Sequence, residues 1–179
     1  MTDAEQIRLV LRAQAGDRDS VEALLGHLSA PLRSYIARII GSIATDDVLQ
    51  ETLIQIWRDL RCLREAELIK PWSYRIASRC AFKWLKRNRR FVQVDNETSS
   101  VEHIPAPTRD QLLLFTTAEE FLNVLSPASR AVLVLHYLDE HSIDEVAAIL
   151  EITQGTAKSR LAYGLSCLRE FINRKGVKK

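Results

Sequence analysis

The 179-residue chain has few cysteines, glycines and prolines: three, six and five of each. The cysteines, Cys62, Cys80 and Cys167, form no CxxC pair, and their odd number argues against a disulfide framework. So few helix breakers, together with long apolar patterns at helical spacing, predict an all-α fold. No stretch approaches the ~20 apolar residues of a membrane span, and the acidic amino terminus does not resemble a secretory signal. We therefore expect no membrane insertion and a cytoplasmic location with reduced thiols.

Residue patterns typical of catalysis are also missing from the sequence. The four histidines are scattered, and His136 and His141 are five residues apart rather than the four of a helical metal pair. There is no glycine-rich loop of the kind that cradles phosphates. We therefore expect neither an enzyme nor a bound metal or cofactor. The net charge is only +2, so any affinity for nucleic acid must come from a local concentration of basic residues.

Such a concentration lies between residues 70 and 90, which include eight Lys or Arg and no acid. On a helix, one stripe contains Arg75, Arg79, Lys83, Lys86 and Arg90, with Trp72 and Phe82 at its edges. A separate apolar face contains Ile76, Ala77, Cys80, Ala81 and Trp84. Basic residues beside aromatic rings suit a nucleic-acid backbone and unstacked bases. The alternative is a solvated face whose aromatic residues belong to the core.

Helices are predicted over residues 3–15 and from about Ser20 to Gly41, and Pro31 should kink or split the second of them. A third helix is predicted to begin at Thr45 or Asp46 and to run to residue 60. Its predicted core face is Leu49, Leu53, Ile56, Trp57 and Leu60. Its opposite face is Asp47, Val48, Glu51, Ile54, Gln55 and Arg58. Two aliphatic residues among charges indicate a docking surface, although isolated exposed apolar residues are also normal.

The second half of the chain contains a predicted helix-turn-helix. An apolar helix over residues 112–124 comes first, and Ser126-Pro127 then begins a helix to Leu138. Ser142 and Glu145 form a capping box, and Thr153 caps a helix to about Asn173. The predicted inner face of this last helix is Ala157, Leu161, Gly164, Leu165 and Leu168. Small outer residues (Gly155, Ser159, Ala162 and Ser166) would let its backbone approach a DNA groove, flanked by Thr156, Lys158, Arg160 and Tyr163. An ordinary helical hairpin is the alternative.

Residues 91–109 lack periodicity and predict a flexible linker between small helical domains at 1–90 and 110–179. Fully extended, such a linker spans about 60 Å, which is near the ~70 Å of two DNA turns. The two domains are therefore expected to reach separate sites on one DNA molecule.

Two motifs of the first domain, and one of the second, resemble a known family. Asp46-Asp47-Val48-Leu49-Gln50-Glu51-Thr52 with Trp57, and Pro71-Trp72-Ser73-Tyr74-Arg75-Ile76-Ala77, are similar to region 2 of bacterial sigma factors of the extracytoplasmic-function (ECF) group. Gly155-Thr156-Ala157-Lys158-Ser159-Arg160-Leu161 is similar to region 4 of the same group. The resemblance implies a factor that directs promoter-specific transcription initiation, with core RNA polymerase, promoter DNA and an anti-sigma factor as partners.

The resemblance also implies roles for individual residues. Contacts with the β′ clamp helices of the polymerase are expected for Asp47, Gln50, Glu51, Ile54 and Arg58. Contacts with the −10 element are expected for Trp72, Arg75, Arg79, Lys83 and Lys86. Contacts with the −35 element are expected for Thr156, Lys158, Ser159, Arg160 and Tyr163. Residues 61–69 would form the loop that captures a flipped −10 base.

The sequence departs from the family at the turn, where Glu151 replaces the usual glycine. A left-handed conformation there would cost roughly 1 kcal/mol. Tyr163 and Leu165 also stand where basic residues are common. Two other functions remain open: a decoy that sequesters an anti-sigma factor, and a stand-alone helix-turn-helix regulator. The intact basic stripe argues against the decoy, and the helix over residues 45–60 argues against the regulator.

Overall fold

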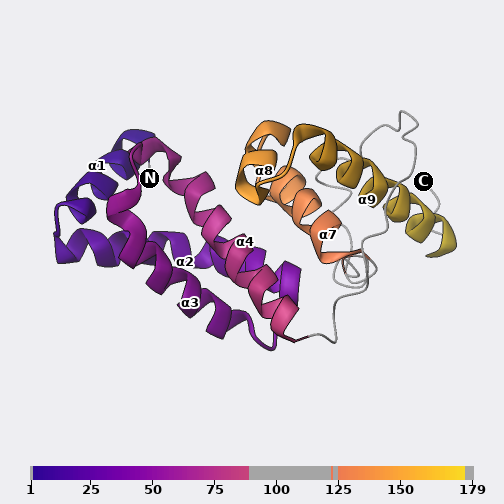
Figure 1. Ribbon diagram of the computed structural model, residues 1–179, viewed down its shortest axis with the longest axis horizontal. Coiled ribbons are helices and arrows are strands. Elements are labelled where there is room, and N and C mark those ends of the chain that lie inside the picture. Colours follow the sequence, from indigo (N-terminus) through magenta and orange to yellow (C-terminus); the bar gives the residue numbers. More distant parts are fainter. Residues whose placement is uncertain (1, 89–121, 123–124, 176–179) are drawn as a thin grey trace. The chain divides into compact units, whose positions relative to one another are not determined.

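The computed structural model describes residues 2–88, 122 and 125–175, and every element that these residues form is a helix (Figure 1). The predicted all-α fold is therefore confirmed. The chain divides into two compact units, Met1–Arg90 and Phe91–Lys179. The predicted linker at 91–109 lies outside the described residues, as does the helix predicted over 112–124 apart from Leu122.

The first unit is built from α1 (Asp3–Gln14), α2 (Arg18–Ile40), α3 (Thr45–Asp59) and α4 (Ile69–Arg87). Short 3₁₀ turns at Leu60–Cys62 and Ala66–Leu68 connect α3 to α4. Thr2 and Glu5 form a capping box at the start of α1. The helix α2 is not split at Pro31, contrary to one expected outcome. Pro31 itself is exposed, while the neighbouring Leu28 and Leu32 are buried in the core on the same helix.

Hydrogen bonds and aromatic packing fix the helices of the first unit against one another. The fully buried Tyr35 of α2 shares a hydrogen bond of 2.7 Å with Ser78 of α4. Its ring packs edge-on against Tyr74, with 5.3 Å between the ring centroids. Gln14 of α1 donates to the carbonyl oxygens of Leu60 and Leu63, at 2.9 and 2.7 Å. Because these partners are buried or partly buried, the bonds specify how the helices cross.

The buried face of α3 differs from the predicted one by a rotation of the helix. Val48, predicted to point outward, is 1% exposed, and Trp57, predicted for the core, is 56% exposed. Both predictions were wrong. Thr52 is fully buried instead, because its hydroxyl donates to the Val48 carbonyl oxygen at 2.7 Å and needs no water. On α4 the apolar face is confirmed except that Trp84 is half-buried and Leu85 is buried.

The second unit contains α7 (Pro127–Leu133), a π-helical turn (Val134–Leu138), α8 (Ile143–Leu150) and α9 (Gln154–Lys175). The helix starts predicted at Ser126 and Ser142 are confirmed: Ser126 accepts a bond from the Ser129 N–H, and Ser142 forms the capping box. The turn residue Glu151 is left-handed, with φ 57° and ψ 42°. This conformation reverses the chain between α8 and α9, so the short helix, tight turn and long helix of a helix-turn-helix are present.

Candidate functional site

The outer face of α3 brings together the residues expected to bind the polymerase. Asp47, Gln50, Ile54 and Arg58 are exposed and Glu51 is half-buried. They line one open depression together with Gln55, Asp59 and Lys83. Ile54 is 48% exposed although charged and polar side chains surround it. The arrangement is an apolar contact point with a polar rim, which is the usual anatomy of a protein interface.

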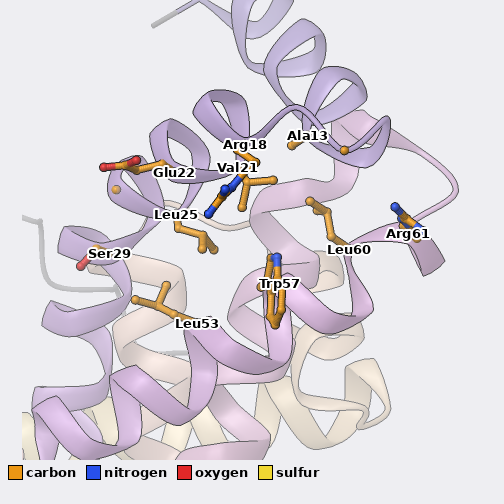
Figure 2. A pocket seen from close by; sticks show the side chains of 12 residues that line it. Ala13, Arg18, Val21, Glu22, Leu25, Ser29, Leu53, Trp57, Leu60 and Arg61 are labelled. Atoms are coloured by element: carbon orange, nitrogen blue, oxygen red, sulfur yellow. The ribbon is translucent and has the colours of Figure 1, made fainter.

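An apolar groove of about 800 Å³ continues this surface between α1, α2 and α3 (Figure 2). Leu25, Leu53 and Trp57 point into the groove, and Arg18 and Arg61 also line it. The same three apolar residues also line a smaller hollow shared with Gln50 and Ile54, so the groove and the depression adjoin along α3. The groove was not predicted from the sequence, because Trp57 and Leu53 were expected in the core.

The basic residues of α4 are only partly directed to solvent. Arg79, Lys83 and Lys86 are exposed, whereas Trp72 and Arg75 are half-buried. The Nε atom of Arg75 is buried, with no hydrogen-bond partner among the described residues. The stripe is therefore present from Arg75 to Lys86, with its first members partly within the protein, and Arg90 lies outside the described residues.

Two contacts join the basic stripe to the outer face of α3. Lys83 Nζ donates to Glu51 Oε1 at 2.6 Å, and Cys80 Sγ donates to Gln55 Oε1 at 3.6 Å. The pairs run in opposite directions along the two helices, so α3 and α4 are antiparallel here. Burial raises the pKa of the Cys80 thiol, which keeps it protonated and able to donate. The structure thus brings a residue expected to bind DNA into contact with one expected to bind polymerase.

In the second unit, α9 displays the residues expected at the −35 element. Thr153 accepts a bond from the Thr156 N–H at 3.1 Å, which confirms the predicted cap. The side chains along the helix lie as follows: Lys158 and Ser159 are exposed, while Thr156, Arg160 and Tyr163 are half-buried. The predicted inner face is confirmed, with Ala157, Gly164, Leu165 and Leu168 buried and Leu161 half-buried.

The first turns of α9 carry small exposed residues, and the start of the helix is hydrogen-bonded to α8. Gly155 and Ser159 are exposed there, so a flat surface such as a DNA groove could approach the backbone closely. The amide of Gln154 donates to the Asp144 carboxylate of α8, which holds the first turn of α9 in place.

The described residues contain no cluster of three or more His, Cys, Asp or Glu that could hold a metal ion. His136 and His141 meet instead in a structural contact, with His136 Nδ1 lying 2.8 Å from the His141 carbonyl oxygen. Within the same described ranges, no helix is long and apolar enough to cross a membrane.

Family models match both units: Sigma-70 region 2 at residues 24–91, and Sigma-70, region 4 at residues 121–170. The ECF RNA polymerase sigma factor SigW of Bacillus subtilis is 24% identical over 174 residues, covering 90% of this chain and 93% of the relative. The ECF RNA polymerase sigma-E factor of Escherichia coli is 28% identical over 169 residues, covering 86% of each chain.

Two solved structures share the fold. One is CnrH in complex with the cytosolic domain of CnrY, with a TM-score of 0.71, 20% identity, and coverage of 94% of this chain and 97% of that one. The other is the sigma factor RpoE in complex with the anti-sigma factor NepR from Bartonella quintana, with a TM-score of 0.67, 23% identity, and coverage of 88% and 98%. The chain belongs to the sigma-70 family of transcription initiation factors. Within that family it is an alternative sigma factor of the ECF group.

Proposed function

We propose that this sigma factor divides promoter recognition between its two units. Residues 1–90 bind core RNA polymerase and open the −10 element, residues 110–179 bind the −35 element, and residues 91–109 tether them. The boundaries of the two family matches and the chain's division into two compact units support this assignment. The tether supplies each unit with a high effective concentration at its own site once the other is bound.

The polymerase surface is the outer face of α3. Its residues Asp47, Gln50, Glu51, Ile54 and Arg58 contact the β′ clamp helices. The observation that carries this proposal is the exposure of Ile54 and Trp57, at 48% and 56%, on a helix otherwise lined with charge. Burying two large apolar side chains at the centre of an interface is a strong source of affinity. Trp57 and the neighbouring groove therefore extend the surface that the family resemblance implied.

The promoter surfaces lie on α4 and α9. On α4, Arg75, Arg79, Lys83 and Lys86 contact phosphates and Trp72 stacks on an unpaired base of the −10 element. On α9, Thr156, Lys158, Ser159, Arg160 and Tyr163 contact the −35 element. The exposed basic residues of α4 and the small exposed residues at the start of α9 support these roles.

The remaining partner is an anti-sigma factor that withholds the protein from polymerase until it is needed. RpoE, one of the structures with the same fold, is solved in complex with the anti-sigma factor NepR. Since its chemistry is recognition rather than bond making, the protein needs no catalytic group or cofactor of its own. It acts in the cytoplasm, where polymerase and chromosome meet.

The test of the polymerase surface is the Ile54→Asp variant. Because Ile54 is half exposed, the free energy of unfolding of the variant should lie within about 0.5 kcal/mol of the wild-type value. Loss of an apolar contact at the centre of the interface should weaken binding to core polymerase by about tenfold or more, equivalent to 1.4 kcal/mol. Affinity is measured by titrating labelled protein with core polymerase, and function by promoter-specific transcription with the reconstituted holoenzyme.

Two matched variants make the result decisive. Ile43→Asp changes the same residue type at a fully exposed position outside α3 and should affect neither stability nor binding. Ile56→Asp places a charge at a fully buried position of α3 and should unfold the first unit. A stable Ile54→Asp protein that binds polymerase normally would refute the proposed surface. Unfolding of that variant would instead place Ile54 in the core.

A further inference from the structure

The ion pair between Glu51 and Lys83 joins two surfaces with different ligands. The Lys83 Nζ atom lies 2.6 Å from Glu51 Oε1, and the two side chains are 51% and 41% exposed. Lys83 belongs to α4, yet it lines the same depression as the polymerase-binding face of α3. The neighbouring contact between Cys80 and Gln55 also joins the two helices at this point, so the packing of α3 against α4 brings the two members of the pair together.

We propose that Glu51 is a positioning residue that holds Lys83 away from DNA in the free protein and releases it when polymerase occupies the outer face of α3. This inference rests on the proposed function, in which Glu51 contacts polymerase and Lys83 contacts a phosphate of the −10 element. While the pair is formed, the carboxylate neutralises the ammonium, and Lys83 contributes little to the attraction of a DNA strand. Polymerase groups that bind Glu51 remove this partner, and Lys83 then becomes available to the DNA.

Linkage makes the effect reciprocal. Any ligand that needs one member of the pair must first break the pair, so removing the other member should help that ligand. Neutralising Glu51 should therefore strengthen the binding of free protein to DNA, and removing Lys83 should strengthen the binding of polymerase. Because both partners are substantially exposed, each gain is limited to about two- to fivefold at low salt. The gain should diminish as salt screens the pair.

The DNA arm of the test uses the full-length protein and a fluorescent single-stranded oligothymidylate, followed by anisotropy at low salt. Glu51→Gln should tighten binding by about two- to fivefold and steepen its salt dependence by about 0.7 in log–log slope, the value for one added phosphate contact on a single strand. Lys83→Met alone should change binding little, because the pair already withholds this lysine from DNA. It should abolish the gain in the Glu51→Gln background, so the double variant should match Lys83→Met. Asp47→Asn is the matched control, because it removes an equal charge from the same face without touching the pair.

The polymerase arm titrates the same variants with core polymerase. Lys83→Met should bind about two- to fivefold more tightly than the wild type, whereas Glu51→Gln should bind more weakly. Weaker polymerase binding by Lys83→Met would make Lys83 a direct polymerase contact and overturn the inference. An equal gain in DNA affinity from Asp47→Asn and Glu51→Gln would also overturn it, because general charge rather than the pair would then be responsible.

The outcomes also separate this inference from the proposed function. If Lys83→Met leaves DNA affinity unchanged in the Glu51→Gln background, the assignment of Lys83 to the −10 surface fails, and the inference fails with it. If Lys83→Met weakens DNA binding but Glu51→Gln does not strengthen it, only the inference fails. Thermal unfolding of each variant checks that the exposed substitutions leave the fold intact.

Discussion

Gly164 of α9 lies directly against Leu133 of α7, and replacing it by alanine should destabilise the second unit. A Cβ atom built on Gly164 would stand 2.5 Å from Leu133 Cδ1 and 3.1 Å from its Cγ. Leu133 is only 3% exposed, so its side chain would have to move within a close-packed core. Gly164→Ala therefore requires either a shift of α9 or an unfavourable rotamer of Leu133.

The magnitude follows from two opposing terms. Replacing a helical glycine by alanine gains about 1 kcal/mol in helix propensity. Overpacking a well-packed core costs about 1–3 kcal/mol. We expect the second term to prevail, with a net loss of about 1 kcal/mol, or a fall of about 4–8 °C in the Tm of a unit of this size. Gly26→Ala is the matched control, because a Cβ there meets no atom within 4 Å and Gly26 lies in the middle of α2. This variant should gain about 0.5–1 kcal/mol.

Urea unfolding of both variants, followed by circular dichroism, measures the difference. A double-variant cycle with Leu133→Ala then tests the cause. If the clash is real, Leu133→Ala should cost less in the Gly164→Ala background than in the wild type, with a coupling of about 0.5–3 kcal/mol. Equal stabilisation by Gly164→Ala and Gly26→Ala, with additive effects in the cycle, would refute the close approach of the two helices.

Two further predictions concern the helix-turn-helix. Hydrogen bonds from the Ser142 backbone and hydroxyl lower the pKa of Glu145 below its ordinary 4.5, so its charged form stabilises the folded state. That contribution is complete above about pH 4.5 and is lost as the pH falls through the lowered pKa. The midpoint of urea unfolding should therefore fall more steeply on acidification in the wild type than in Glu145→Gln. Parallel acid profiles would show that the capping carboxylate contributes nothing. Glu151→Gly should stabilise the second unit by about 1 kcal/mol in urea unfolding, because glycine adopts the left-handed conformation without strain. A loss of stability would mean that the Glu151 side chain contributes more than its backbone costs.

The local signals of the sequence predicted the helix starts in the described part of the second unit. The caps at Ser126, Ser142 and Thr153 were predicted and are present. Each depends on a hydroxyl and a backbone N–H only three residues away, so tertiary packing has little influence on it. The left-handed conformation of Glu151 was considered because the family usually has glycine at this turn position, and the structure has it.

The orientation of α3 could not be predicted in the same way. Its apolar residues form no single stripe, and the predicted core face was the one that included the largest of them, Trp57. In the structure a threonine takes the buried position, because its hydroxyl is satisfied by its own helix. Hydrophobicity alone predicts that Trp57 is buried and that Thr52 is exposed. The surface exposed by this rotation is the apolar groove, so the wrong prediction and the missed feature have one cause.

The contact between Glu51 and Lys83 could not be predicted from the sequence at all. The two residues are 32 positions apart, and similarity to known motifs assigned each to a different ligand. Only the antiparallel packing of α3 and α4 brings the proposed polymerase surface and the basic stripe to a common border. Since an ion pair crosses that border, a substitution on either surface changes the charge presented by the other. A loss of transcription in a Lys83 variant therefore cannot be assigned to DNA until its affinity for polymerase has been measured, and the same holds in reverse for Glu51.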